Sequence, residues 1–320
     1  MSPYITGVRR LGHPRRDYPK IWRLITMTFG SGDFRYEVIK GWGDLPPGYK
    51  LFQVAGVAVD AADRVFAYNR SDHKLIVFNR DGSFVKAWKN TTSVPHGMRI
   101  GPDGNIYLVD QASHVVLKYS PDEELLLTLG NRNQPSDTGY GEHKVVKRAA
   151  GPFNNPTGGA VNEAGEIFIS DGYGNCRVHK YSPQGELLKS WGVPGTEGPG
   201  EFLLPHGIDL DKQGRLLVAD RENHRIQLFT QDGEHLDTWT GFRQPCSITV
   251  GPDGTVYVPE LGSRMSILDS DGNVLARWGG EESKAAGEFI APHGAAVDSR
   301  GDLYVGEVLE GSRLQKFARV

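Results

Sequence analysis

Residues 97–130 read GMRIGPDGNIYLVDQASHVVLKYSPDEELLLTLG, and residues 207–240 read GIDLDKQGRLLVADRENHRIQLFTQDGEHLDTWT. Both stretches follow one plan: an apolar run, a turn with glycine, a run that ends in an acid, a polar bend, and two alternating runs joined by a second turn. Short alternating runs separated by pairs such as Asp103-Gly104 are typical of antiparallel strands joined by hairpins. Each stretch therefore predicts a unit of four short strands.

The same plan occurs six times along the chain. One position at the start of the first strand holds, in order, Ala55, His96, Thr157, His206, Cys246 and His293. The spacings are 41, 61, 49, 40 and 47 residues, and a four-stranded propeller blade takes roughly 40–50. The long spacing contains a polar segment, 131–150, between the second and third repeats. We interpret it as a surface loop that is either a lid over a functional site or an uninvolved excursion.

The two ends of the chain indicate a closed ring. Four repeats end in a strand whose last residue is tryptophan, as in 84–88 and 187–191, but the sixth stops after its third strand, 314–317. The missing strand is found near the N-terminus, at 36–43. A strand from one terminus that completes the last blade removes the open edges of a propeller. The sequence predicts an all-β, six-bladed β-propeller over residues 36–320, with residues 1–35 as an arm on its outside.

Composition narrows the classes of partner. The chain has 320 residues, 23% of them charged, and a formal net charge of -3, so we expect neither nucleic acid nor an anionic membrane as a partner. No apolar run approaches the ~20 residues of a membrane span, and the first 30 residues lack the pattern of a signal peptide. Two cysteines make no disulfide framework. We expect a cytoplasmic protein, and the oligomeric state stays open.

Three of the six aligned positions hold histidine, each within Pro-His-Gly and each in an alternate repeat. First strands line the channel of a propeller, so His96, His206 and His293 should meet near the axis at about 120° to one another. Three histidines with open positions left for substrate are the catalytic form of a zinc site. We predict Zn²⁺ or another divalent transition metal here. The alternative for each single histidine is a packed, hydrogen-bonded residue, and Cys246 is either an added thiolate ligand or a small channel residue.

A second aligned position ends the second strand of each repeat and is acidic in five repeats: Asn69, Asp110, Asp171, Asp220, Glu260 and Glu307. We interpret these residues as acceptors for backbone N–H groups that fix the blade, with some also orienting the histidines. The residues that follow fall on loops at the face where a substrate enters. They are Arg70, Gln111, Tyr173 and Arg221. The arginines suit a carboxylate, and a tyrosine near a metal can act as acid or base.

Several segments resemble the NHL-repeat propellers and, among them, the peptidyl-α-hydroxyglycine α-amidating lyases. They are PHGMRIGPDGNIYLVDQASHVVLKY from 95, PTGGAVNEAGEIFISDGYGNCRVHKYSPQGELLKSWG from 156, and LPHGIDLD with VADRENHRIQLF in the fourth repeat. The resemblance runs from about 52 to 320. It implies a zinc ion held by His96, His206 and His293, a substrate-binding arginine at Arg70, and a catalytic tyrosine at Tyr173.

Two departures from the family pattern affect the expected site. The family has an acid tied to a structural calcium directly after the third histidine, where this chain has Gly294, and it has a methionine where this chain has Ala291. The backbone positions that would share the calcium, Val57 and Met98, remain. The missing carboxylate argues against a calcium ion.

Three functions are compatible with the sequence. The first is a metal-dependent carbon–nitrogen lyase that cleaves an N-acyl or peptidyl α-hydroxyglycine, or a related carbinolamide, to an amide and a carbonyl product such as glyoxylate. In it Tyr173 takes the hydroxyl proton, while Arg70, Arg221 and Gln111 bind a small or peptide-like substrate that carries a carboxylate. The second is a metal-dependent hydrolase of a small ester, lactone or amide. The third is a non-enzymatic NHL scaffold, because one fold hosts many functions.

Overall fold

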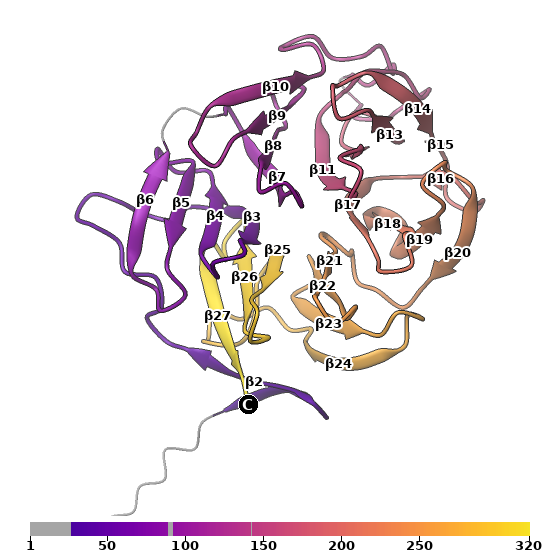
Figure 1. Ribbon diagram of the computed structural model, residues 1–320. Coiled ribbons are helices and arrows are strands. Elements are labelled where there is room, and N and C mark those ends of the chain that lie inside the picture. The colour runs from indigo at the N-terminus through magenta and orange to yellow at the C-terminus, as the bar shows by residue number, and fades with distance from the viewer. Residues whose placement is uncertain (1–26, 89–91, 142) are drawn as a thin grey trace, which may run out of the picture.

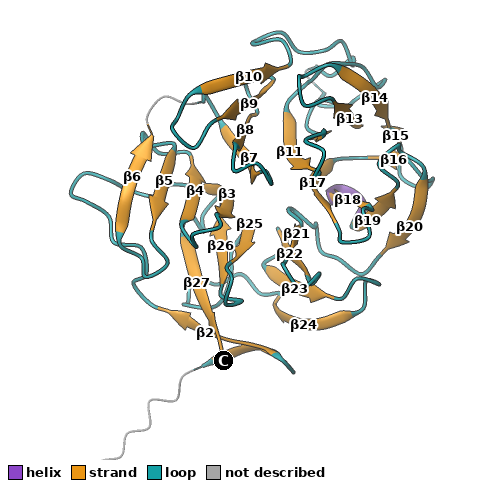
Figure 2. Ribbon diagram, viewed as in Figure 1, coloured by secondary structure: helices purple, strands orange, loops and turns teal. Residues whose placement is uncertain are grey.

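The computed structural model describes residues 27–88, 92–141 and 143–320. Six sheets stand around a central axis (Figure 1), which confirms the predicted all-β, six-bladed propeller. The one helical segment in these ranges is a single 3-10 turn, η1 (Arg221–Asn223), beside β18 (Figure 2). Within the same ranges, no helix has the length and apolar character needed to span a bilayer.

Blades 1 to 5 are antiparallel meanders whose first strand lies nearest the axis. Blades 1 and 2 contain β3 (Val54–Val59), β4 (Val65–Asn69), β5 (Leu75–Phe78), β6 (Phe84–Trp88), β7 (Pro95–Ile100), β8 (Ile106–Asp110), β9 (Val115–Tyr119) and β10 (Leu125–Leu129). Blade 3 contains β11 (Pro156–Val161), β12 (Ile167–Asp171), β13 (Arg177–Tyr181) and β14 (Leu187–Trp191). A short parallel pair, β15 (Val193–Pro194) and β16 (Glu201–Phe202), precedes blade 4.

The second half of the ring repeats the arrangement. Blade 4 contains β17 (Pro205–Leu210), β18 (Leu216–Asp220), β19 (Arg225–Phe229) and β20 (His235–Trp239). Blade 5 contains β21 (Thr249–Val250), β22 (Val256–Glu260), β23 (Arg264–Leu268) and β24 (Val274–Gly279). Its first strand is short because pairing near Cys246 is reduced to a single bridge between Pro245 and Glu260.

Blade 6 is built from both ends of the chain, as predicted. Its strands are β25 (Pro292–Val297), β26 (Leu303–Glu307) and β27 (Leu314–Arg319), followed by β2 (Phe34–Ile39) and β1 (Thr28–Ser31). The closing strand β2 pairs with β27 and begins at Phe34, two residues before the predicted boundary. Residues 28–35 are therefore part of the blade, because β1 and β2 form a hairpin, and the rest of the predicted arm, 1–26, lies outside the described residues.

Hydrophobic cores lie between neighbouring blades. Strand β8 shows how one strand serves two of them: Ile106 and Leu108 pack toward blade 1, whereas Tyr107 and Val109 pack toward blade 3. Successive side chains of a strand point to opposite faces, so a strand with blades on both sides is apolar throughout. This explains why the second strands of the repeats read as continuous apolar runs.

A buried ionic cluster joins blade 6 to blade 1, where the ring closes. Arg80 Nε lies 2.7 Å from Asp298 Oδ2, and the same guanidinium bonds Asp302. Lys316 Nζ lies 3.1 Å from Asp302 Oδ2 and donates to the Arg80 carbonyl. The closure thus combines strand pairing with charged contacts between its two sides.

Candidate metal centre

The three Pro-His-Gly segments begin the inner strands of blades 2, 4 and 6. In each, the proline pairs with the acid at the end of the second strand, as Pro95 does with Asp110. The register then shifts before regular pairing resumes. A β-bulge bends a strand and re-aims a side chain. In these three blades the bulge lies at the histidine, and the histidine side chain points toward the axis of the propeller.

The glycine of each segment allows the next blade to come close. A Cβ on Gly97 would lie 2.5 Å from the Thr157 carbonyl oxygen, and one on Gly207 would lie 2.6 Å from Ser247 Cα. Neither distance is possible for real atoms, so these sites exclude every side chain. The glycines therefore bring the backbone at the intervening aligned position into contact with the histidine.

That contact is a hydrogen bond that orients each ring. The Nδ1 atom lies 2.6–2.7 Å from a carbonyl oxygen of the next blade in all three cases: His96 with Thr157, His206 with Cys246, and His293 with Ala55. A carbonyl oxygen can only accept, so Nδ1 carries the hydrogen and Nε2 keeps its lone pair. Such partners fix the tautomer and ring orientation of metal-binding histidines.

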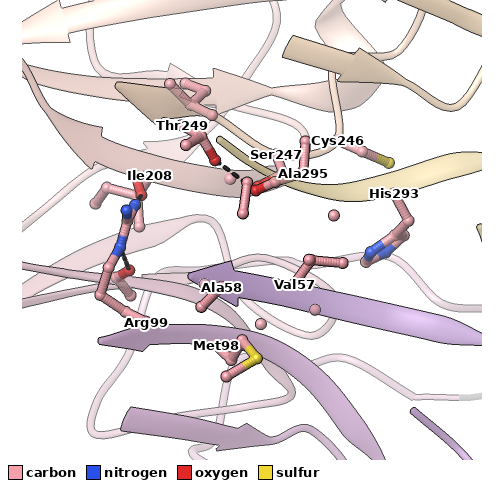
Figure 3. A pocket seen from close by; sticks show the side chains of 18 of the residues that line it. Val57, Ala58, Met98, Arg99, Ile208, Cys246, Ser247, Thr249, His293 and Ala295 are labelled. Carbon is pink, nitrogen blue, oxygen red and sulfur yellow. Dashed lines mark hydrogen bonds between the residues drawn. The ribbon is translucent and has the colours of Figure 1, made fainter. Parts of the chain in front are cut away.

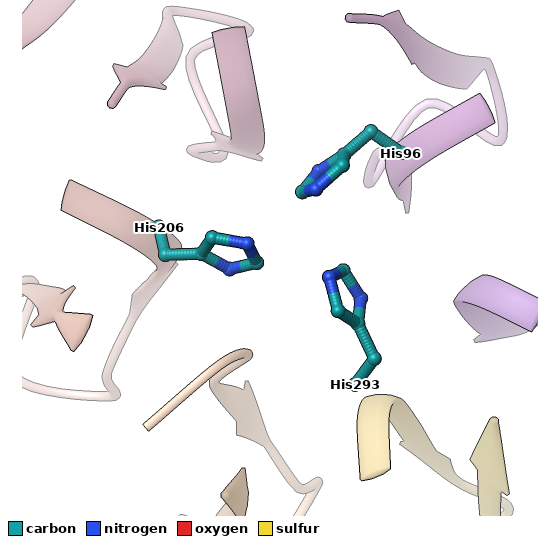
Figure 4. A group of neighbouring side chains, drawn as sticks. All are labelled: His96, His206 and His293. Carbon is teal, nitrogen blue, oxygen red and sulfur yellow. The ribbon is translucent and has the colours of Figure 1, made fainter. Parts of the chain in front are cut away.

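The three rings converge with near three-fold symmetry (Figure 4). Each pair of ring centroids is 4.8 Å apart, and one nitrogen from each ring lies within 4.8 Å of the others. All three side chains are buried. Burial lowers the pKa of His96 and His206 well below the ordinary value and that of His293 to about 3. The rings are therefore neutral, which is the form that binds a metal.

This arrangement fits a divalent transition metal. Three imidazole donors meet near the axis of the propeller, at one end of its channel. Imidazole is a good ligand for zinc, copper, iron and nickel. No carboxylate or thiol in the described residues joins the group. His96, His206 and His293 would hold such an ion and leave positions open to a substrate.

Tyr173 lies directly over the histidines. Its hydroxyl is 3.1 Å from His96 Nε2 and 3.3 Å from His206 Nε2, and Arg221 Nη1 donates to it at 3.3 Å. The Arg221 guanidinium also lies 5.4 Å from the ring centroid. Burial raises the pKa of Tyr173, and the positive charge of Arg221 opposes that shift. A bound cation would lower this pKa further, in the direction that general-base chemistry requires.

The two predicted arginines stand on either side of the site. Arg70 Nη1 donates to Gln53 Oε1 at 2.6 Å, and Nε donates to the Pro95 carbonyl at 3.2 Å. No hydrogen bond within the described part of the chain uses its Nη2 atom. Burial lowers the pKa of Arg70. The role of Gln53 as the residue that holds Arg70 was not predicted, because it precedes a strand and belongs to no repeated position.

Gln111 and Cys246 have different surroundings. Gln111 follows β8 at the same face, but its side chain makes no hydrogen bond among the described residues, so its role stays a prediction. Cys246 and Cys176 are free and buried. Burial raises the pKa of the Cys246 thiol to about 11, although Arg221 opposes this. These features favour Cys246 as a small channel residue whose carbonyl orients His206.

The acids at the ends of the second strands hold the backbone in place. Asp110, for example, accepts from Ser93 N and Val94 N at 2.8 and 3.0 Å, and Glu307 accepts from Ile290 N at 2.7 Å. The interpretation that they fix the blades is correct. The idea that some orient the histidines is wrong, because backbone carbonyls occupy every Nδ1 atom.

The channel continues beyond the histidines as a cavity of about 300 Å³. His293 and Cys246 lie at one side of it and Arg99 at the other (Figure 3). There Arg99 Nη2 pairs with Asp209 Oδ1 at 2.9 Å. Of the described residues that line the cavity, none is Tyr173, Arg70 or Arg221. The predicted catalytic side chains therefore belong to the opposite, loop-bearing side of the histidine layer.

Gly294 has the same close packing as the other two glycines. A Cβ there would lie 2.8 Å from the Ala55 carbonyl oxygen and 3.1 Å from Val57 N. An acid at this position needs a shifted backbone, and the described part of the chain places no carboxylate or thiol with the histidines. The residues present do not fit the family's calcium site.

Fold and site together define a six-bladed propeller whose alternate blades present histidines to one point on its axis. Residues 202–229 match the NHL repeat family. The chain is 34% identical over 287 residues to NHL repeat-containing protein 3 of Mus musculus, and the match covers 82% of this chain and 78% of that protein. The chain belongs to the NHL-repeat family of propellers.

Two further similarities extend this result. The chain is 31% identical over 262 residues to peptidyl-alpha-hydroxyglycine alpha-amidating lyase 1 of Drosophila melanogaster, which covers 72% of this chain but only 45% of that protein. Among solved structures, a gluconolactonase of Xanthomonas campestris matches with a TM-score of 0.62 and 15% identity over 90% of each chain. At that identity the likeness concerns the fold alone.

Proposed function

We propose that this protein is a metal-dependent lyase that cleaves the C–N bond of an N-acyl or peptidyl α-hydroxyglycine, or of a related carbinolamide. The observation that carries the proposal is the position of the Tyr173 hydroxyl, within 3.1–3.3 Å of two Nε2 atoms of an oriented His₃ group. The similarity to amidating lyases supports it. Zn²⁺ is the expected ion, and other divalent transition metals suit the same ligands.

The chain's own residues would bind and orient the substrate. When bound at His96, His206 and His293, the metal supplies Lewis acidity toward the substrate hydroxyl group. Arg70 would hold the carboxylate through its unused Nη2 donors, in a charge-assisted hydrogen bond. Arg221, already bonded to the Tyr173 hydroxyl, would add a second positive charge, and Gln111 a further contact at the rim.

Tyr173 would move the proton. Burial raises the pKa of Tyr173 and the charge of Arg221 opposes that rise; in its ionised form, which a bound cation would favour, the phenolic oxygen would take the proton of the substrate hydroxyl and return it to the departing amide nitrogen. The C–N bond breaks, a C=O bond forms on the former hydroxyl carbon, and no water is consumed. An α-hydroxyglycine then gives a primary amide and glyoxylate.

α-Hydroxyhippurate tests the reaction, because its products identify the chemistry. The lyase predicts benzamide and glyoxylate in equal amounts, above the enzyme-free rate, and no benzoate. The variants Tyr173→Phe and His206→Ala should lose this activity. His235→Ala is a matched control, since His235 lies on outer strand β20 and, among the described residues, its ring bonds Thr238 alone.

Other products would replace the proposal. Benzoate without benzamide would indicate the hydrolase. No turnover of any carbinolamide by metal-loaded protein would leave a binding scaffold, which the similarity to NHL repeat-containing protein 3 also allows.

A further inference from the structure

The long segment between blades 2 and 3 makes specific contacts with the turn that bears Tyr173. We call residues 131–155 the buttress; all but residue 142 are described. The turn is Gly172–Asn175, between β12 and β13. Sequence alone left the first part of this segment, 131–150, as a lid or an excursion. Its contacts indicate a different role.

The backbone of the turn is confined between the buttress and blade 4. Gly174 N donates to the Asn154 carbonyl at 2.9 Å, and Tyr173 N donates to the Asn155 carbonyl at 3.4 Å. A Cβ on Gly174 would lie 2.2 Å from Asn154 Oδ1, and one on Gly172 would lie 2.0 Å from the Pro205 carbonyl oxygen. Both neighbours of Tyr173 must therefore be glycine for the turn to pack this closely against the buttress and blade 4.

Within the buttress, Thr138 bonds the carbonyl side of the turn. Its hydroxyl donates to the Gly174 carbonyl at 2.6 Å and accepts from Asn154 Nδ2 at 3.2 Å. Thr138 is 1% exposed. The same Asn154 Nδ2 also donates to the Ser136 carbonyl at 3.0 Å. A buried, satisfied network of this kind specifies one arrangement.

Asn175 closes the network at the far end of the turn. Its Nδ2 donates to the Ala150 carbonyl at 2.7 Å and to Asp171 Oδ2 at 2.8 Å. Asp171 in turn accepts from Asn154 N at 3.0 Å. Asn175 and Asp171 are fully buried. The buttress thus contacts the turn at Tyr173, Gly174 and Asn175.

We propose that the buttress fixes the Tyr173 hydroxyl over the histidines, with Thr138 as its principal positioning residue. Thr138 itself touches neither the histidines nor the reacting atoms. The consequence for catalysis rests on the proposed function, whereas the consequence for the position of Tyr173 does not. Asn154 and Asn155 make contacts of the kind seen ahead of the other inner strands, whereas Thr138 and Ala150 add hydrogen bonds from the segment that lengthens this repeat.

The variant Thr138→Val tests this, because it keeps the size of the side chain and removes the hydroxyl. Thr138→Ser restores the hydroxyl. Ser263→Ala is a matched control: Ser263 is buried and donates to the Ile290 carbonyl at the same 2.6 Å, between blades 5 and 6. Each protein is labelled at Cζ of tyrosine, and the Tyr173 resonance is assigned by its loss in Tyr173→Phe. Hydrogen exchange of residues 172–175 is followed in parallel.

In Thr138→Val we expect a moved or broadened Tyr173 resonance and about tenfold faster exchange of the turn amides. On α-hydroxyhippurate, kcat should fall about 10- to 100-fold with KM nearly constant, since small displacements of a reacting group have effects of this order. Thr138→Ser and Ser263→Ala should retain the wild-type resonance. A wild-type resonance and wild-type exchange in Thr138→Val would overturn the proposal. An inactive wild-type protein would refute the lyase, and the resonance would still decide the role of the buttress.

Discussion

Replacing Gly207 with alanine tests whether the close approach of blades 4 and 5 sets the metal ligands. The added Cβ would lie 2.6 Å from Ser247 Cα and 2.7 Å from the Cys246 carbonyl oxygen, against an ordinary contact of 3.4–4 Å. Both opposing atoms are backbone, so no side chain can rotate away. Relief of both contacts requires the two backbone segments to separate by about 0.8 Å.

The separation acts on the bond that orients His206. Its Nδ1 lies 2.6 Å from the Cys246 carbonyl oxygen, the same atom that the new methyl group would displace. Overpacking in a close-packed region costs about 1–3 kcal/mol, and weakening one buried hydrogen bond adds about 1 kcal/mol. Loss of a partner that orients a ligand typically lowers metal affinity about 10- to 100-fold.

Urea unfolding of the metal-free protein and competition with a chelator for Zn²⁺ measure the two effects. We expect Gly207→Ala to lose about 2–4 kcal/mol of stability and at least tenfold in zinc affinity. Gly141→Ala is the control, because a Cβ at Gly141 meets no atom within 4 Å. It should stay within about 0.5 kcal/mol of the wild type. A Gly207→Ala protein as stable and as tight for zinc as this control would refute the reasoning.

Three further predictions concern the ring and its ions. Arg80→Met should lower the free energy of unfolding by about 2 kcal/mol, less than a fully buried pair would give, because a quarter of the Arg80 side chain is exposed; calorimetry that finds no change contradicts this. His114 Nδ1 accepts from Asn155 N at 3.0 Å, and burial lowers its pKa. The unfolded chain therefore binds this proton first, so stability should decline as pH falls below ~6.5. In His114→Asn the side chain keeps a hydrogen-bond acceptor and tolerates the left-handed backbone conformation, but it cannot bind this proton. Urea titrations at pH 5 and pH 7 should therefore show a smaller loss of stability in the variant than in the wild type; an equal loss contradicts the interpretation. Adding millimolar Ca²⁺ to the metal-loaded protein should leave the melting temperature unchanged, since Gly294 offers no carboxylate to calcium; a rise would contradict this.

The features that could be predicted from the sequence are those that repeat. The alternation of histidine with small residues predicted that the three histidines converge, and the missing strand after β27 predicted the closure. The orienting partners could not be predicted. They are the backbone carbonyls of Ala55, Thr157 and Cys246. Every residue has a backbone carbonyl, so the side chains at these positions do not reveal that the residues orient the histidines.

Two differences from the prediction have a common cause. The acids after the second strands were expected to reach some histidines, but they bond the backbone ahead of each inner strand. Segment 131–150 was expected to be a lid or an excursion, but its Thr138 hydroxyl and Ala150 carbonyl bond the turn that carries Tyr173. In both cases the contacts are side chain to backbone. Such contacts have no spacing rule in the sequence and depend on how neighbouring segments meet.

Metal content tests the central claim most directly. The protein would be purified without added metal or chelator, as wild type and as His206→Ala, and measured by elemental analysis together with the His235→Ala control. The account predicts one divalent transition metal per chain in the wild type and the control, and its loss in His206→Ala. Wild-type protein that neither contains nor takes up a metal, or metal retained in full by His206→Ala, would contradict the assignment of the channel histidines as a metal centre.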